Sequence, residues 1–192
     1  MAKSLCELQL QLTRSKGQNI HESNMQNDEV GNFPNSKELV EIGETNLKEH
    51  CRLGMRAKYI IQLAKNVESG TLSLEKLEKN CNLYSYQDVH RRLSKLKGFG
   101  PFSIATVLMC MGCYQKVPAD SETKRHIKQV YGISSCKSLT IVEDAEQIYM
   151  KYAPFQSIVF WFELLQSYEK KYGKLSELDE SNYHTITGSR IL

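Results

Sequence analysis

The sequence predicts an all-α protein, a helical bundle without a sheet, and three observations support that prediction. Only 4 prolines and 11 glycines occur in 192 residues, which leaves little punctuation for a many-turned β-sandwich. Apolar residues recur three or four positions apart along most of the chain, and no segment alternates cleanly with a period of two. Hydrophobic residues make up 41% of the chain and charged residues 24%, as in ordinary globular proteins. We therefore expect nine or ten helices.

The first half of the chain contains several stretches with helical spacing. Leu5, Leu8 and Leu12 predict the first helix, over residues 2–14. The segment from about residue 15 to residue 35 is polar and lacks any period, so we predict a flexible loop there. The other helices expected in this half are a short one that begins near residue 36 and three over residues 46–51, 55–68 and 73–79.

The second half contains five more stretches of this kind. Gly132 is expected to end one of them, and Pro154 suits the first turn of the last. One helical domain is expected over residues 1–172, and residues 173–192 are expected to form a C-terminal tail. The helices expected in this half cover residues 84–96, 101–114, 121–131, 143–152 and 155–172.

Positive charge is concentrated in one segment of the chain. The whole sequence has 25 basic and 22 acidic residues, a net charge of +3. Between residues 90 and 128 the net charge is +6, which leaves −3 for the remainder. This pattern is typical either of a solvated helix face or of a surface that binds a polyanion. The basic residues of the segment are Arg91, Arg92, Lys95, Lys97, Lys116, Lys124, Arg125 and Lys128.

Membrane insertion and export are not expected. The longest apolar stretches, residues 104–111 and 158–162, fall far short of the ~20 residues that span a bilayer. The first residues contain no uninterrupted apolar core, so we expect no cleaved signal peptide. Six cysteines without an export signal are typical of reduced thiols in a nucleus or cytosol.

A glycine-containing turn between two apolar stretches is the most informative feature. Residues 93–105 are Leu-Ser-Lys-Leu-Lys-Gly-Phe-Gly-Pro-Phe-Ser-Ile-Ala. Gly98 and Gly100 permit positive φ and let another backbone approach closely. The helix that follows would direct its free N–H groups at whatever lies against the turn, and a DNA phosphate flanked by Lys95 and Lys97 is the natural ligand. A plain corner between two helices is the alternative.

This hairpin resembles the helix-hairpin-helix of the DNA glycosylase superfamily that includes endonuclease III and the 8-oxoguanine and 3-methyladenine glycosylases. Leu96, the triplet at residues 98–100 and Ser103 match its pattern. A second signature of the family, a loop ending in an aspartate with a basic residue one turn on, resembles residues 117–125, Val-Pro-Ala-Asp-Ser-Glu-Thr-Lys-Arg. Residues 53–60, Leu-Gly-Met-Arg-Ala-Lys-Tyr-Ile, are similar to a segment of the 8-oxoguanine and alkylbase branches.

The resemblance implies that Asp120 is the catalytic carboxylate. Base excision breaks an N-glycosidic bond through an oxocarbenium-like transition state, which a nearby carboxylate stabilises or assists by activating a water. On the local sequence, Asp120 is also an N-cap for the helix over 121–131, and the two roles are compatible. Phe102 stands where bifunctional members carry a lysine nucleophile, and a phenyl ring cannot form a Schiff base. The resemblance therefore implies a monofunctional glycosylase that uses water.

The resemblance also implies contacts with DNA and with the flipped base. The carbonyls of Ser94, Leu96 and Phe99 would hold a monovalent cation, Na⁺ or K⁺, between the turn and DNA. A pocket for the flipped base would be lined by Phe102, Thr106 and Trp161, although packing in the core is an equal interpretation of Phe102. Lys124 and Arg125 would add phosphate contacts, with ordinary surface charge as the alternative. The full set expected to contact DNA is Lys95, Lys97, Gly98, Phe99, Gly100, Phe102, Ser103, Lys124 and Arg125.

Cys110 and Cys113 have the spacing of a metal or redox pair, but no second pair accompanies them. Some members of the superfamily bind an iron–sulfur cluster through four C-terminal cysteines, whereas this chain has none after Cys136. We therefore expect no iron–sulfur cluster and interpret the pair as small buried hydrophobic residues.

Together these features predict a nuclear, monomeric, monofunctional glycosylase that removes a damaged base, with an alkylated base as the suggested substrate, from double-stranded DNA in base excision repair. The family segment that carries a loop to fill the gap left by the flipped base is not found ahead of the first helix. The helical domain is therefore expected to be N-terminally incomplete. One alternative is a helix-hairpin-helix module that binds DNA but has lost activity, and another is a helical protein-interaction domain.

Overall fold

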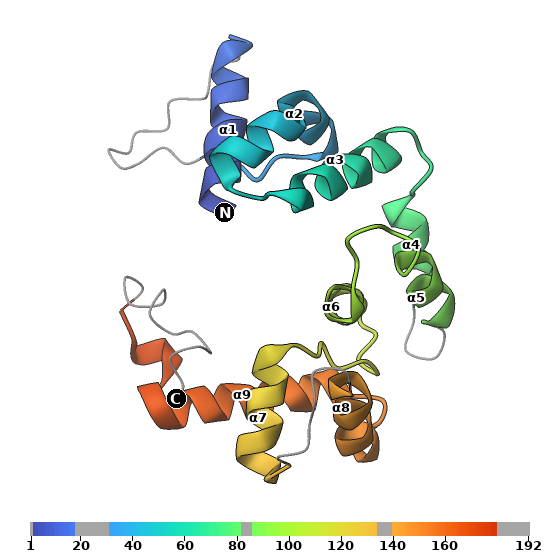
Figure 1. Cartoon of the computed structure of the whole chain (residues 1–192), viewed down its shortest axis with the longest axis vertical. Coiled ribbons are helices and arrows are strands. Elements are labelled where there is room, and N and C mark those ends of the chain that lie inside the picture. The colour runs from blue at the N-terminus through green and yellow to red at the C-terminus, as the bar shows by residue number, and fades with distance from the viewer. Residues whose placement is uncertain (1, 18–30, 82–85, 134–139, 180–192) are drawn as a thin grey trace. The chain divides into compact units, whose positions relative to one another are not determined.

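The computed structural model describes residues 2–17, 31–81, 86–133 and 140–179, and this part of the chain contains helices and no strand (Figure 1). The predicted all-α class is confirmed. No helix of the described ranges is long and apolar enough to cross a membrane. The helices, in chain order, are α1 (Ala2–Ser15), α2 (Ser36–Cys51), α3 (Met55–Glu68), α4 (Leu74–Asn80), α5 (Gln87–Leu93), α6 (Pro101–Cys110), α7 (Ser121–Tyr131), α8 (Ile141–Tyr149) and α9 (Gln156–Tyr172), with short 3₁₀ turns at Met150–Tyr152 and Leu175–Glu177.

Contacts within the chain divide it into two compact units, which are described separately here. The first unit comprises residues 1–76 together with residues 96–98 of the hairpin turn, and the second comprises residues 77–95 and 99–192. The predicted single domain over residues 1–172 stays a prediction. The central part of the loop predicted at 15–35 lies outside the described residues.

The first unit is a cluster of α1, α2 and α3, which contact one another in sequence order. The start of α2 is fixed by hydrogen bonds between neighbouring residues. The Asn35 side chain accepts a hydrogen bond from the Glu38 N–H, and the Glu38 carboxylate accepts one from the Asn35 N–H. Gly43 has φ 79° and kinks α2, so the two short helices predicted here are the two halves of one interrupted helix. The core consists of Leu5, Leu8, Ile42, Leu47, Cys51, Leu53, Ala57 and Ile61.

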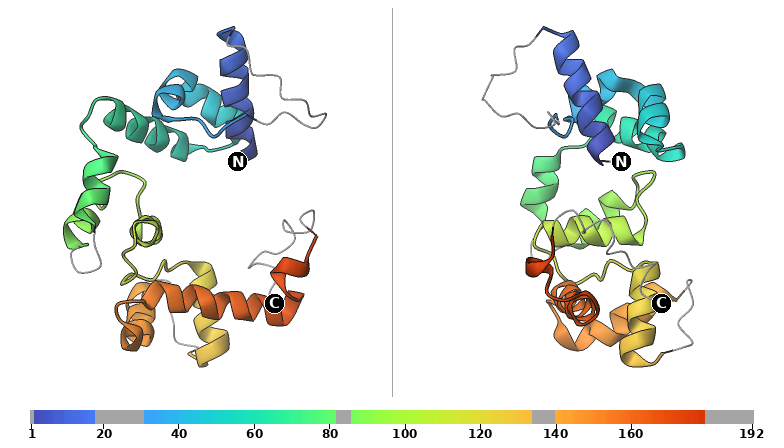
Figure 2. Two further views of the ribbon diagram at one scale, coloured as in Figure 1. Left: turned by 180° about the vertical axis from the view of Figure 1, so that it is seen from behind. Right: turned by 90° about the vertical axis from the view of Figure 1, so that its left-hand side faces the viewer.

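The second unit is centred on α7, α8 and α9 (Figure 2). Asp120 caps α7 at its start, and Gly132 ends the same helix with φ 68°, as the sequence predicted. The apolar core buries the inner faces of the three helices and the loop before α7. Its members are Val117, Ala119, Ile127, Ile141, Ala145, Tyr149, Phe160 and Leu164.

A carboxylate at the centre of this second unit holds the three helices together. Glu163 of α9 accepts hydrogen bonds from the hydroxyl of Tyr131 at 2.9 Å and from the hydroxyl of Tyr149 at 2.7 Å. The Nε2 atom of His126, on α7, lies 3.5 Å from the same carboxylate. Burial and the Glu163 hydrogen bond together raise the pKa of Tyr131 to about 12. Because this network links α7, α8 and α9, it stabilises the second unit as a whole.

Acidification is expected to destabilise the second unit through His126. Its side chain is fully buried, and burial lowers its pKa below the ordinary value of 6.5, against the opposing effect of Glu163. The folded state therefore keeps the imidazole neutral, while the unfolded chain takes up a proton as the pH falls below about 6.5. The urea concentration at the unfolding midpoint should therefore decrease when the pH is lowered from 7.5 to 5.5. A His126→Gln variant should show a smaller fall, and an equal fall in both proteins would contradict this assignment.

Several helix boundaries differ from the predictions. The helix predicted to run to residue 114 ends at Cys110, because Gly112 has φ 83° and the Cys113 N–H turns back to the Leu108 carbonyl at 2.9 Å. Pro154 lies before α9 rather than in its first turn, since that helix begins at Gln156. The helix predicted over residues 84–96 is shorter at its C-terminal end, where it stops at Leu93.

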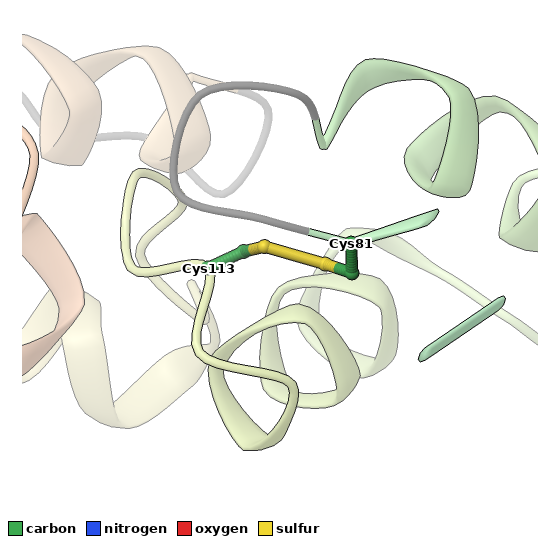
Figure 3. Close-up of a disulfide and its surroundings, with 2 residues drawn as sticks. All are labelled: Cys81 and Cys113. Atoms are coloured by element: carbon green, nitrogen blue, oxygen red, sulfur yellow. A yellow bond between two sulfur atoms is a disulfide. The ribbon is translucent and has the colours of Figure 1, made fainter. Parts of the chain in front are cut away.

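The cysteines also differ from the predictions. Cys113 follows α6 and forms a disulfide with Cys81, which follows α4 (Figure 3). The expectation of reduced thiols is therefore wrong for this pair. Cys113 is buried as expected, but Cys110 is a free, exposed cysteine, so its interpretation as a buried hydrophobic residue is also wrong. Sequence spacing could not reveal the disulfide, because its partners are separated by 32 residues.

Candidate functional site

The second unit contains an open cavity of about 320 Å³ with mostly apolar and aromatic walls. The first turn of α6 contributes Phe102 to the wall. The loop before α7 and the first turn of α7 contribute the polar residues, and one face of α9 forms the remaining wall. A cavity of this size with a few convergent polar groups is typical of a small-molecule site. The lining residues are Phe102, Pro118, Asp120, Glu122, Phe160, Trp161, Leu164, Leu165 and Tyr168.

Asp120 is held at the edge of this cavity by the start of α7. Its Oδ1 atom accepts hydrogen bonds from the N–H groups of Glu122 at 2.9 Å and Thr123 at 3.0 Å. The buried Thr123 hydroxyl accepts the Asp120 N–H at 3.1 Å and donates to the Pro118 carbonyl at 3.1 Å. These contacts all orient the backbone or Oδ1, so they fix the direction of the carboxylate without engaging Oδ2. The capping role predicted for Asp120 is confirmed.

A second carboxylate, Glu122, lines the cavity close to Asp120. Its Oε1 atom accepts a hydrogen bond from the Tyr168 hydroxyl at 3.0 Å and one from Arg125 Nε at 2.9 Å. Burial, followed by the hydrogen bond to Glu122, raises the pKa of Tyr168 to about 12, so the phenol remains a hydrogen-bond donor at neutral pH. Arg125 also donates to Gln129. The Glu122 side chain is therefore clamped from two directions.

The structure brings three of the predicted site residues together and separates one. Phe102, Asp120 and Trp161 line one cavity, although they are far apart in the sequence. Thr106 is not among the lining residues, and its hydroxyl donates to the Phe102 carbonyl at 2.9 Å within α6. Thr106 lies four residues, about one turn, beyond Phe102, whereas only the first turn of α6 meets the cavity.

The hairpin turn shows a difference between its two glycines. Gly98 has φ 89°, and a Cβ atom at this position would lie 2.9 Å from the ring of Tyr59 in the first unit. Gly100 is the N-cap of α6 with φ −98°, and a Cβ there would meet no atom within 4 Å. The positive φ that both glycines permit therefore occurs at Gly98 and not at Gly100. What approaches Gly98 is a side chain rather than a backbone. Lys95 and Lys97 are both exposed.

Sequence reasoning missed Glu122, Thr123 and Tyr168. Glu122 and Thr123 follow the recognised aspartate directly, so an inspection of the first helical turn would have found them. Tyr168 lies seven residues beyond Trp161, which is helical spacing on one face of α9. That signal was present in the sequence, but the spacing alone does not say which face meets the cavity.

Sequence comparison finds similarity to DNA glycosylases. No protein-family model matches the chain. The chain is 24% identical over 144 residues to the "Putative DNA-3-methyladenine glycosylase YfjP" of Bacillus subtilis, and the match covers 74% of this chain and 49% of that protein. It is 34% identical over 118 residues to the N-glycosylase/DNA lyase of Saccharomyces cerevisiae, covering 55% of this chain and 30% of that protein.

Structure comparison finds the same fold in solved proteins. An 8-oxoguanine glycosylase/lyase of Clostridium acetobutylicum in complex with double-stranded DNA matches 88% of this chain and 53% of that chain, with a TM-score of 0.64 and 20% identity. A structure of MBOgg1 with a low-affinity DNA ligand matches 84% of this chain and 51% of that chain, with a TM-score of 0.64 and 25% identity. The chain spans about half or less of the length of the relatives it matches.

Proposed function

We propose that this chain, which is similar in sequence to DNA glycosylases, is a monofunctional glycosylase that removes a damaged base from double-stranded DNA in base excision repair. The observation that carries the proposal is that Asp120 lies beside Phe102 and Trp161 in one cavity. A flipped base would enter the aromatic part of the cavity, and its deoxyribose would remain at the edge near Asp120.

The proposed chemistry places Asp120 at the developing positive charge of the sugar. As the N-glycosidic bond breaks, electrons leave with the base and the deoxyribose acquires oxocarbenium character. The Oδ2 atom would stabilise this charge or accept a proton from an attacking water, which would complete hydrolysis and leave an abasic site. Phe102 provides no amine, so the proposed reaction forms no Schiff base and no strand cleavage at this position.

DNA would be held mainly through its backbone. The hairpin N–H groups, with Lys95 and Lys97, are proposed to contact phosphates, and Ser94, Leu96 and Phe99 are proposed to supply carbonyls for a monovalent cation. The start of α6 supports the first part, because no side chain caps it and its N–H groups remain available to a ligand. We also propose that the protein acts as a monomer in the nucleus.

A panel of damaged duplexes tests this proposal. Oligonucleotides with one alkylated, oxidised or deaminated base should yield an abasic site that breaks only after treatment with alkali. Borohydride should trap no covalent adduct, because no lysine attacks the sugar. A trapped adduct would refute the monofunctional mechanism, and the absence of release from every lesion would refute the glycosylase proposal.

The second candidate is a DNA-binding module without activity. The observation that favours it is the hairpin, because the uncapped start of α6 and the exposed Lys95 and Lys97 side chains would bind DNA whether or not Asp120 is catalytic. This candidate predicts DNA binding that weakens steeply with salt and accompanies no base release. Release of any lesion base would exclude it.

A further inference from the structure

The two charged side chains of the cavity offer acceptors to a ligand rather than donors. Among the lining side chains, Asp120 and Glu122 are carboxylates, and the hydroxyl hydrogen of Tyr168 is donated to Glu122. The remaining walls are apolar or aromatic. Apart from the indole N–H of Trp161, the lining side chains therefore offer acceptors rather than donors to a base.

Glu122 has the geometry of an oriented acceptor. The hydrogen bonds from Tyr168 and Arg125 all end on Oε1, so they fix the carboxylate and leave Oε2 unengaged by them. The side chain is 18% exposed, which means that much of its hydration is already lost. A carboxylate oxygen in such a place forms a strong, charge-assisted hydrogen bond when an N–H group reaches it.

Glu122 differs from Asp120 in what it can do. Asp120 caps the helix and lies exposed at the rim, where the sugar would be. Glu122 lies two residues beyond Asp120, within the first turn of α7, and its carboxylate accepts a hydrogen bond from Tyr168 on α9, the helix that forms the aromatic wall. Its place is therefore suited to the edge of a base that stacks on that wall rather than to the sugar.

We propose that Glu122 determines specificity by accepting an N–H hydrogen bond from the base. The cavity would select bases that carry an exocyclic amino group over bases of the same shape that lack one. Tyr168 is a positioning residue, since it acts by orienting the Glu122 carboxylate. This inference rests on the proposed function, because it assumes that a base occupies the cavity.

Fluorescence of Trp161 tests the inference without requiring catalysis. Trp161 is the single tryptophan of the chain and lines the cavity, so its emission should report a bound base. The two ligands are 9-methyladenine and 6,9-dimethylpurine, which have nearly the same shape, while only the first has an amino group. The full chain should bind 9-methyladenine about tenfold more tightly, as expected for a hydrogen bond to a charged group.

Variants of Glu122 should remove this preference. In Glu122→Met the affinity ratio of the two bases should fall to about one, and in Glu122→Gln, which keeps a neutral acceptor, it should fall part of the way. Tyr168→Phe should also lower the ratio, because Glu122 loses one of its two clamps. The matched control is Glu143→Gln on α8, a carboxylate outside the cavity lining, which should leave the ratio unchanged.

The outcomes separate this inference from the proposed function. An unchanged ratio in Glu122→Met, or no binding of either base to the full chain, would overturn the inference. If Glu122→Met does not fold, as judged by circular dichroism, the test rests on the affinity ratio of the two bases in Glu122→Gln. An unchanged ratio in that variant would overturn the inference. A preference that depends on Glu122, in a protein that releases no lesion base, would refute only the proposed activity.

Discussion

Replacing Asp120 with asparagine is expected to lower the rate of base release at least about 100-fold. Asparagine has the same shape and still offers an oxygen to the N–H groups of Glu122 and Thr123, so the cap of α7 survives. What is lost is the negative charge that would stabilise the oxocarbenium-like sugar. The measurement is single-turnover release of a damaged base from a lesion duplex on which the unmodified protein is active.

Two further variants separate chemistry from capping. Asp120→Ala should lose activity to the same degree and should also lower the free energy of unfolding by about 1 kcal/mol, since it removes the cap. Glu143→Gln, on α8 and outside the cavity lining, should change neither quantity. Undiminished release by Asp120→Asn would show that the carboxylate does not take part in the reaction.

Replacing Gly98 with alanine is expected to destabilise the first unit by about 2 kcal/mol or more. Part of this effect comes from the backbone, because φ 89° is unfavourable for any residue with a Cβ. The remainder is steric, since the new Cβ would lie 2.9 Å from the Tyr59 ring. Urea unfolding of the variant should show a lower midpoint.

Gly100 supplies the matched control for Gly98. Gly100→Ala should change stability little, because φ is −98° and no atom lies within 4 Å of the new Cβ. In a double-mutant cycle, Tyr59→Ala should relieve only the steric part of the Gly98→Ala effect. Equal stability of the two alanine variants would show that the Tyr59 contact and the positive φ at Gly98 have no energetic weight.

The sequence predicted helix boundaries well where capping residues or apolar spacing mark both ends of a helix. The apolar spacing over residues 55–68 predicted α3 with the boundaries that the structure has. Asp120 and Gly132 predicted both ends of α7, because a capping side chain and a left-handed glycine act on adjacent backbone groups. The end of α6 differs from the prediction, because Gly112 with its positive φ follows the helix within a largely apolar stretch.

Much of the candidate site also followed from the sequence. The turn at residues 98–100 and the loop that ends at Asp120 are contiguous motifs, so their residue types and spacing can be recognised without coordinates. The same motifs led to Phe102, where the absence of an amine points to the proposed mechanism. These features depend on a few neighbouring residues, so they can be recognised from the sequence alone.

Tertiary structure alone decided which side chains meet. Glu122 and Tyr168 are 46 residues apart, and Tyr59 and Gly98 are 39 apart. Whether Thr106 or Tyr168 lines the cavity depends on how α6 and α9 are rotated about their axes, and both residues satisfied the helical spacing. The sequence by itself therefore determined the helices, the hairpin and the identity of the candidate carboxylate. Only the packing determined which distant side chains line the cavity with that carboxylate, because the contact of two helices depends on the side chains of both and no local pattern records it.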